Sequence, residues 1–206
     1  MIKSNKGLTP ASSAKRLKIL EAARELFFNL GFAGTSIDKI VAVAGGSKST
    51  VYRFFKSKEA ILKELLDHEI EGHLGSLWKI NQESTPIKEG LMLIGEEALL
   101  VLTSKHSTEI HRLSIGEANR VPSIGKIFYE NGPNTGHMRL ENYLHMQAKL
   151  GHFKCTDAGK AAEYFWAMLM HKVMMERYLG ISKPMDKKSA KSLAKRTVED
   201  FLTLKV

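Results

Sequence analysis

All five prolines of this 206-residue chain stand at the ends of apolar repeats with helical spacing, and none lies inside one. Proline within a helix removes a backbone hydrogen bond and clashes with the preceding turn, so these repeats are free to form helices. Sustained alternation of β-branched residues and two-residue hairpin signals are missing from the sequence. We therefore predict an all-α fold of about nine helices. They are expected over residues 13–30, 36–43, 47–54, 58–74, 86–103, 106–119, 122–150 with a break at Gly132 and Pro133, 156–179 and 186–204.

Basic side chains are concentrated at the start of the chain. Residues 1–58 contain eleven lysines and arginines against three acidic residues, which accounts for almost all of the net charge of +9. A basic segment beside a nearly neutral one is typical of a protein that binds a polyanion through a separate domain. We predict a small basic domain over residues 1–58 and a larger helical domain over residues 59–206. The charge by itself is equally compatible with a solvated basic tail.

Two short helices joined by a glycine turn are predicted at residues 36–43 and 47–54. Thr35 or Ser36 is placed to cap the first of them, and Ser47 is placed to cap the second. Two short helices separated by a glycine-containing turn are typical of a helix-turn-helix. An ordinary helical hairpin with polar caps is the alternative interpretation.

The first turn of the second short helix carries small hydrogen-bonding side chains and one cation, namely Ser47, Lys48, Ser49 and Thr50. In a helix-turn-helix the N-terminal residues of the second helix reach base edges in the major groove. Side chains that hydrogen-bond to or neutralise phosphates follow closely, namely Tyr52, Arg53, Lys56 and Lys58. The pattern predicts a DNA-binding surface that combines base contacts with phosphate contacts.

The segment from Leu17 to Ile61 resembles the DNA-binding head of the TetR family of transcriptional regulators. The resemblance rests on core and DNA-facing positions at the family's spacing: Ile19, Leu20, Ala22, Ala23, Phe27, Gly31, Phe32, Thr35, Ser36, Ile37, Ile40, Ala44, Gly45, Ser47, Thr50, Val51, Tyr52, Phe55, Ser57, Lys58 and Glu59. The chain departs from the family pattern at Gly46, where valine is common, and at Val41, where alanine is common. Gly46 removes an apolar contact from the turn.

The resemblance implies a role for each matching position. Thr35 or Ser36 would meet the DNA backbone, Ser47–Thr50 would face bases, and Tyr52 and Lys58 would contact phosphates. Lys48 is the residue expected to recognise guanine, because a lysine can donate to guanine acceptors. The alternative role for Lys48, to which we give the same weight as guanine recognition, is a phosphate contact without base recognition.

The rest of the family architecture is a helical body that dimerises and encloses a ligand cavity. The segment from His111 to Tyr178 is similar to the regulators resembling AcrR and AefR. The family implies a four-helix bundle made by the last two helices of two chains, and we predict its contacts from one apolar stripe on each helix. The expected interface residues are Phe165, Leu169, Val173, Leu193, Thr197, Phe201 and Leu202.

A second apolar stripe on the 156–179 helix includes Tyr164, Met168, His171 and Met175. It needs a further partner, which can be a second subunit, a ligand cavity or a wider core. We expect a small apolar effector to be bound in the body, with candidate ligand-binding residues Glu96, His111, Phe128, His145, Met168 and His171. Ordinary surface or core positions are the alternative for each of them, and core filling is the alternative for the methionines.

Several classes of function are excluded by missing motifs. A single cysteine, Cys155, allows no internal disulfide and no cysteine-based metal or redox motif. The sequence contains no P-loop, no dinucleotide glycine fingerprint and no nucleophile elbow, and its histidines are not spaced for a helical metal site. We therefore expect no catalytic residues, no cofactor and no metal. No apolar run approaches a membrane span or a signal peptide, so a cytoplasmic location without membrane contact is expected.

These observations predict a homodimeric, ligand-responsive transcriptional repressor. Its partners would be a near-palindromic double-stranded DNA operator, a second copy of the chain and an unidentified small molecule that releases it from DNA. The alternative is a basic, sequence-tolerant architectural DNA-binding protein without an effector. A helical interaction module whose basic domain binds an acidic partner is a third possibility.

Overall fold

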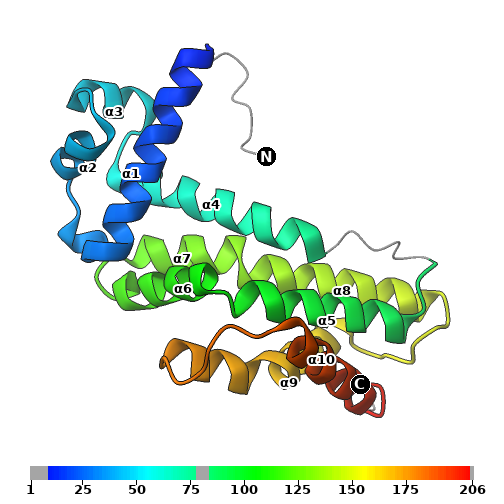
Figure 1. Ribbon diagram of the computed structural model, residues 1–206. Helices are drawn as coiled ribbons and strands as arrows, with labels where there is room; N and C mark the ends of the chain where they lie inside the picture. The colour runs from blue at the N-terminus through cyan, green and yellow to red at the C-terminus, as the bar shows by residue number, and fades with distance from the viewer. Residues whose placement is uncertain (1–8, 78–83, 205–206) are drawn as a thin grey trace. The chain divides into compact units, whose positions relative to one another are not determined.

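The computed structural model describes residues 9–77 and 84–204, with side chains described outside residues 68–77. Those two ranges are helical and contain no strand, so the predicted all-α fold is confirmed. The helices are α1 (Pro10–Gly34), α2 (Ile37–Ala44), α3 (Lys48–Phe54), α4 (Lys58–Leu77), α5 (Ile87–Leu102), α6 (Lys105–Ala118), α7 (Pro122–Asn131), α8 (Pro133–Lys149), α9 (Ala158–Tyr178) and α10 (Lys187–Phe201) (Figure 1). The predicted break at Gly132 and Pro133 is confirmed, because α7 ends at Asn131 and α8 begins at Pro133.

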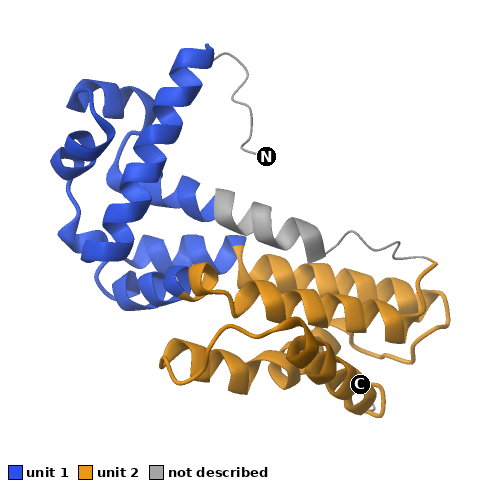
Figure 2. Ribbon diagram, in the orientation of Figure 1, with its two compact units in different colours: residues 1–72, 109–131 blue, residues 73–108, 132–206 orange. Residues whose placement is uncertain are grey.

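The chain forms two compact units (Figure 2). Unit 1 consists of residues 1–72 and 109–131, and unit 2 consists of residues 73–108 and 132–206. The division into compact units reflects packing, and it differs from the predicted domain boundary between residues 58 and 59. That boundary stays a prediction.

Unit 1 is built around one apolar cluster. The ring of Phe27 lies 5.2 Å from that of Phe32, centroid to centroid, and both side chains are only 1% exposed. Side chains from α1 to α4, from α6 and from α7 also belong to the cluster, among them Ile19, Ala23, Ile40, Val51, Phe55, Ile61, Leu62, Leu66, Ile110 and Ile124. The short helices α2 and α3 therefore owe their position to burial against α1, since helices of about two turns are marginal on their own.

Unit 2 has a separate core formed by α5, α8, α9 and α10. Gly95 allows α5 and α10 to approach closely, because a Cβ atom at that position would lie 3.3 Å from the Cβ of Ala194. The ring of Phe165 packs edge-on against that of Phe201, and both side chains are fully buried. The other members of the core include Leu91, Ile94, Leu99, Leu140, Tyr143, Leu144, Ala161, Ala162, Leu169, Ala190 and Val198.

Several of the predicted dimer-interface residues are buried within the single chain. Phe165, Leu169, Thr197 and Phe201 are at most 4% exposed, so they offer little surface to a second chain, and their role in a dimer stays a prediction. The other predicted interface residues, Val173, Leu193 and Leu202, pack against the same core. Helical periodicity identified an apolar stripe correctly, but it does not tell whether the stripe meets its own chain or another one.

The second stripe of α9 is the exposed one. Tyr164, Met168 and Met175 are 44%, 41% and 47% exposed, and His171 is exposed beside them. Large apolar side chains recurring at this spacing on one helix face leave an apolar band uncovered in the single chain.

In the described ranges, no helix combines the length and the apolar character needed to cross a membrane.

Truncating the buried ring of Phe165 should destabilise the protein strongly. We expect Phe165→Ala to lower the free energy of unfolding by about 3–5 kcal/mol, because the change removes a large side chain and leaves a cavity. Urea unfolding followed by circular dichroism at fixed protein concentration would measure it. Glu163→Ala, an exposed change on the same helix, should stay within about 0.5 kcal/mol of wild type. Equal losses for the two variants would contradict this description of the core.

Candidate nucleic-acid interface

The segment from Ser36 to Phe54 forms the predicted helix-turn-helix. The Ser36 hydroxyl caps α2 by accepting from the Lys39 amide at 3.2 Å, and the Ser47 hydroxyl caps α3 by accepting from the Thr50 amide at 3.2 Å. Both caps satisfy backbone donors that a short helix leaves unpaired. Of the two residues proposed to cap α2, Ser36 is the one that does so.

The turn between α2 and α3 is held by a lysine from α1. Gly45 and Gly46 adopt positive φ angles of 69° and 97°, which glycine tolerates and other residues rarely adopt. The ammonium of Lys15 donates to the carbonyl oxygens of Ala44 at 3.1 Å and Gly45 at 2.8 Å. These carbonyls lie at the end of α2, where a cation is favourable. Two hydrogen bonds from Lys15 thus connect the turn to α1.

The same lysine explains the glycine at position 46. A Cβ atom on Gly46 would lie 3.2 Å from both Cε and Nζ of Lys15. The space beside Gly46 is therefore taken by the Lys15 side chain. Gly46 lacks a side chain that would make an apolar contact in the turn, and the Lys15 side chain lies beside it instead.

The first turn of α3 presents its side chains to solvent. Ser47, Lys48 and Ser49 are exposed, and the Ser47 hydroxyl lies 2.8 Å from that of Ser49 and 3.0 Å from that of Thr50. The Ser47 hydroxyl is therefore within hydrogen-bond distance of both other hydroxyl groups of this turn. One turn later Tyr52 is 52% exposed, and the exposed Arg53 places its guanidinium 4.8 Å from the ring centroid of Phe54.

Lys48 forms an ion pair that bridges the two helices of the motif. Its ammonium lies 2.8 Å from the carboxylate of Asp38, in the first turn of α2. The hydrogen bond and the charge of Asp38 raise the pKa of Lys48 above its ordinary value. Lys48 is consequently a fully charged donor at the exposed end of α3.

Two residues predicted to contact DNA serve the internal structure. Thr35 is only 2% exposed, and its hydroxyl donates to the carbonyl of Gly31 at 2.9 Å, so the expectation that Thr35 offers its side chain to DNA is corrected. Lys58 donates to the carbonyls of Phe32 at 2.6 Å and Thr35 at 2.8 Å, and its ammonium lies 4.1 Å from the centroid of the Phe32 ring. A phosphate contact by Lys58 therefore rests on its one remaining N–H group.

A second cation from α1 braces the domain in a way that the sequence analysis missed. Arg16 forms an ion pair with Glu64 of α4, and its guanidinium lies 5.3 Å from the centroid of the Phe55 ring. Lys15 and Arg16 contact residues at least 29 positions away in the chain. No periodic pattern reports such contacts, because periodicity identifies a face of one helix and not its partner.

The residues predicted to bind a ligand do not form one cluster within either unit. In unit 1, the ring of His111 meets that of Phe128 edge-on, with centroids 4.8 Å apart. In unit 2, His145, Met168 and His171 are exposed and Glu96 is half-buried. Only the first pair is shown in contact, and the ligand-binding role of all six residues stays a prediction.

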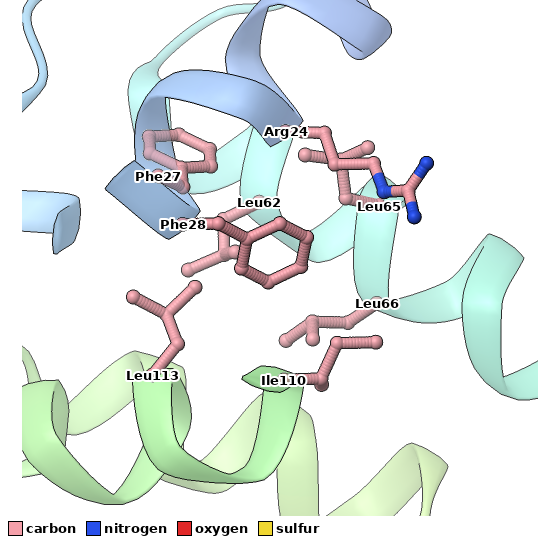
Figure 3. A pocket seen from close by; sticks show the side chains of 8 residues that line it. All are labelled: Arg24, Phe27, Phe28, Leu62, Leu65, Leu66, Ile110 and Leu113. Carbon is pink, nitrogen blue, oxygen red and sulfur yellow. The ribbon is translucent and has the colours of Figure 1, made fainter. Parts of the chain in front are cut away.

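A small apolar pocket lies inside unit 1 (Figure 3). Its volume of about 10 Å³ is close to the room needed by one water molecule, so it holds no organic effector as it stands. Side chains of α1, α4 and α6 surround it, namely Arg24, Phe27, Phe28, Leu62, Leu65, Leu66, Ile110 and Leu113. None of the predicted ligand-binding residues belongs to this set.

Within the described ranges, no three metal-ligating side chains gather in a group that could hold an ion.

Two family models match the chain. Residues 19–65 match the model described as bacterial regulatory proteins, tetR family, and residues 89–204 match the model described as AefR-like transcriptional repressor, C-terminal domain. The second match covers more than half of the chain.

Individual proteins show the same likeness. The HTH-type transcriptional regulator RutR of Escherichia coli (strain K12) is 35% identical over 77 residues, which make up 37% of this chain and 36% of RutR. The match thus spans about a third of that relative's length. A solved structure of a TetR-family transcriptional regulator from Mesorhizobium loti has a TM-score of 0.82 at 27% identity, covering 95% of this chain and 98% of that one. The flavonoid-responsive regulator FrrA has a TM-score of 0.81 at 26% identity, covering 92% and 96%.

Adding a side chain at Gly46 should destabilise unit 1, and the loss should depend on Lys15. We expect Gly46→Ala to cost about 1–3 kcal/mol of stability, because the backbone has a positive φ and the new Cβ meets the Lys15 side chain. Thermal unfolding of the single variants Gly46→Ala and Lys15→Ala and of the double variant would measure the coupling. The double variant should lose less than the sum of the two single losses. Strict additivity would show that Lys15 does not occupy the space beside Gly46.

Proposed function

Because the chain belongs to the TetR family of transcriptional regulators, we propose that it is a homodimeric repressor that a small molecule releases from a near-palindromic operator. The exposed first turn of α3 is the observation that carries the proposal. It presents hydroxyl donors and the Lys48 ammonium at the position that enters the major groove in a helix-turn-helix. The excess of basic residues over residues 1–58 supports attraction to a polyanion.

The exposed residues divide into two groups by the chemistry they offer. The residues proposed to meet base edges lie at the start of α3, where the surface is largely exposed, namely Ser47, Lys48, Ser49 and Thr50. Ser36, Tyr52 and Arg53 are exposed around that turn and suit phosphate oxygens. Phosphate contacts set the orientation of the domain on the duplex, and base contacts select the sequence.

We place the dimer contact on the exposed stripe of α9. Tyr164, Met168, His171 and Met175 form an apolar band that the chain itself does not cover. A two-fold dimer brings the same band of each chain into one interface and presents two DNA-binding domains to two half-sites. Half-sites of such operators are spaced by about 34–36 Å or a multiple of that distance.

The effector is proposed to be a small, largely apolar molecule bound in the helical body. The name of FrrA describes a response to flavonoids, and this chain covers 96% of FrrA at 26% identity. Linkage then requires that the effector weaken DNA binding by the same factor by which DNA weakens effector binding. On this proposal the protein acts on double-stranded DNA in the cytoplasm, and no residue has a catalytic role.

Selection from random duplex DNA tests the proposal directly. The purified full-length chain would be incubated with a random library at physiological salt, and the bound duplexes would be amplified and sequenced. Enrichment of an inverted repeat is the expected result. Weak, salt-sensitive binding without enrichment would support the architectural alternative, and binding to no duplex would exclude both DNA-binding functions.

Arg53 should contribute sequence-independent affinity. We expect Arg53→Ala to weaken binding to operator and random duplex alike, and to reduce the slope of log K against log salt concentration by about 0.9, the value for one lost phosphate contact. Fluorescence anisotropy at several salt concentrations would measure both. Lys191→Ala, which removes an exposed cation from α10, is the matched control and should leave the slope unchanged. A loss confined to the operator would assign Arg53 to base recognition.

Charging the exposed stripe of α9 should separate the subunits. We expect Met168→Glu to give monomers in sedimentation velocity and to weaken operator binding by more than tenfold, because each chain would bury an unpaired carboxylate. Leu93→Glu on α5 is the matched control, since Leu93 is 45% exposed and Met168 is 41% exposed. A dimer that persists in Met168→Glu and dissociates in Leu93→Glu would move the interface to α5.

A further inference from the structure

The ion pair between Asp38 and Lys48 lies on the surface that the proposed function assigns to DNA. The two charged groups are 2.8 Å apart, and their side chains are 65% and 60% exposed, respectively. Asp38 belongs to α2 and Lys48 to α3, so the pair joins the two helices of the motif at its exposed side.

This pair is poorly placed for a structural role. An ion pair in contact with bulk water contributes little to folding, because solvent screens its charges and ordering two side chains costs entropy. Lys48 is also the first residue of α3, and a cation is unfavourable at the positive end of a helix. The two helices are already positioned by their caps and by the Lys15 bonds across the turn. Both charged groups are therefore available to a ligand at the exposed side of the motif.

A phosphate and a base pair affect this ion pair differently. If Lys48 binds a phosphate, the Asp38 carboxylate is left beside a polyanion without its partner, which is unfavourable. A guanine–cytosine base pair offers partners for both groups on its major-groove edge. Guanine O6 and N7 accept from an ammonium, and the cytosine N4 amine donates to a carboxylate.

We propose that Asp38 is a specificity-determining residue, which together with Lys48 recognises one guanine–cytosine base pair in each half-site and opposes sequence-independent phosphate binding. The inference rests on the proposed function, because it requires α3 to enter the major groove. Lys48 donates to guanine, and Asp38 accepts from the paired cytosine while it stays close to the ammonium. Asp38 therefore lowers the affinity for random DNA and raises the selectivity for the operator.

Replacing the carboxylate by an amide of the same shape tests this role. Asp38→Asn should bind random duplex several-fold more tightly, with a salt slope steeper by about 0.9, since Lys48 becomes free to neutralise one phosphate. In selection from random DNA, the preference for guanine–cytosine at one position of each half-site should fall by about tenfold. The double variant Asp38→Asn with Lys48→Met should lose the additional salt dependence.

The matched control is Asp67→Asn on α4. Asp67 pairs with Lys63 at 3.0 Å, and the change alters the net charge by the same amount away from α2 and α3. It should leave the preferred sequence and the salt slope as in wild type. Asp38→Glu keeps the charge and should restore low affinity for random duplex, which separates the charge of Asp38 from any effect of the substitution on folding.

The possible outcomes distinguish this inference from the function on which it rests. If wild type enriches an operator and Asp38→Asn keeps its selectivity and its salt slope, the specificity role is wrong and the repressor proposal stands. The same conclusion holds if Asp67→Asn changes both quantities as much as Asp38→Asn does. If wild type enriches no sequence, the repressor proposal and the specificity role fail together.

Discussion

The geometry of the DNA-binding domain depends on the contact between Lys15 and the turn that joins α2 to α3. The carbonyls that accept from Lys15 belong to Ala44 and Gly45 at the end of α2, and Gly45 and Gly46 turn the chain into α3. Lys15 is on α1, one turn before Ile19, which is buried with Phe27 in the core of unit 1. The orientation of the exposed turn of α3 is therefore coupled to the packing of α1 through one side chain.

That contact belongs to a wider use of cations inside the domain. Lys15, Arg16 and Lys58 each bind carbonyl or carboxylate groups of the chain itself. The positive charge available to DNA is consequently smaller than the count of basic residues over residues 1–58 suggests. Lys48, which is exposed but paired with Asp38, illustrates the same point. Charge counting indicates a polyanion-binding domain but does not identify the residues that bind.

Local features of the fold were predictable because they depend on neighbours in the sequence. Capping by Ser47 and the break after α7 follow from side-chain chemistry within a few residues. Contacts between helices were not predictable in the same way. The burial of Phe165 and the inward direction of Lys58 depend on which helix packs against which. The sequence shows two apolar stripes on α9, and choosing between them requires the packing partners of that helix.

The central claim is that the exposed turn of α3 recognises a particular sequence in duplex DNA. The most direct measurement is the affinity of the full-length protein for its selected operator and for a duplex of the same composition in shuffled order, at one physiological salt concentration. Specific binding of this kind predicts an affinity ratio of about 10³ or more in favour of the operator. Equal affinity for the two duplexes would contradict the claim and would leave only electrostatic attraction to the DNA backbone.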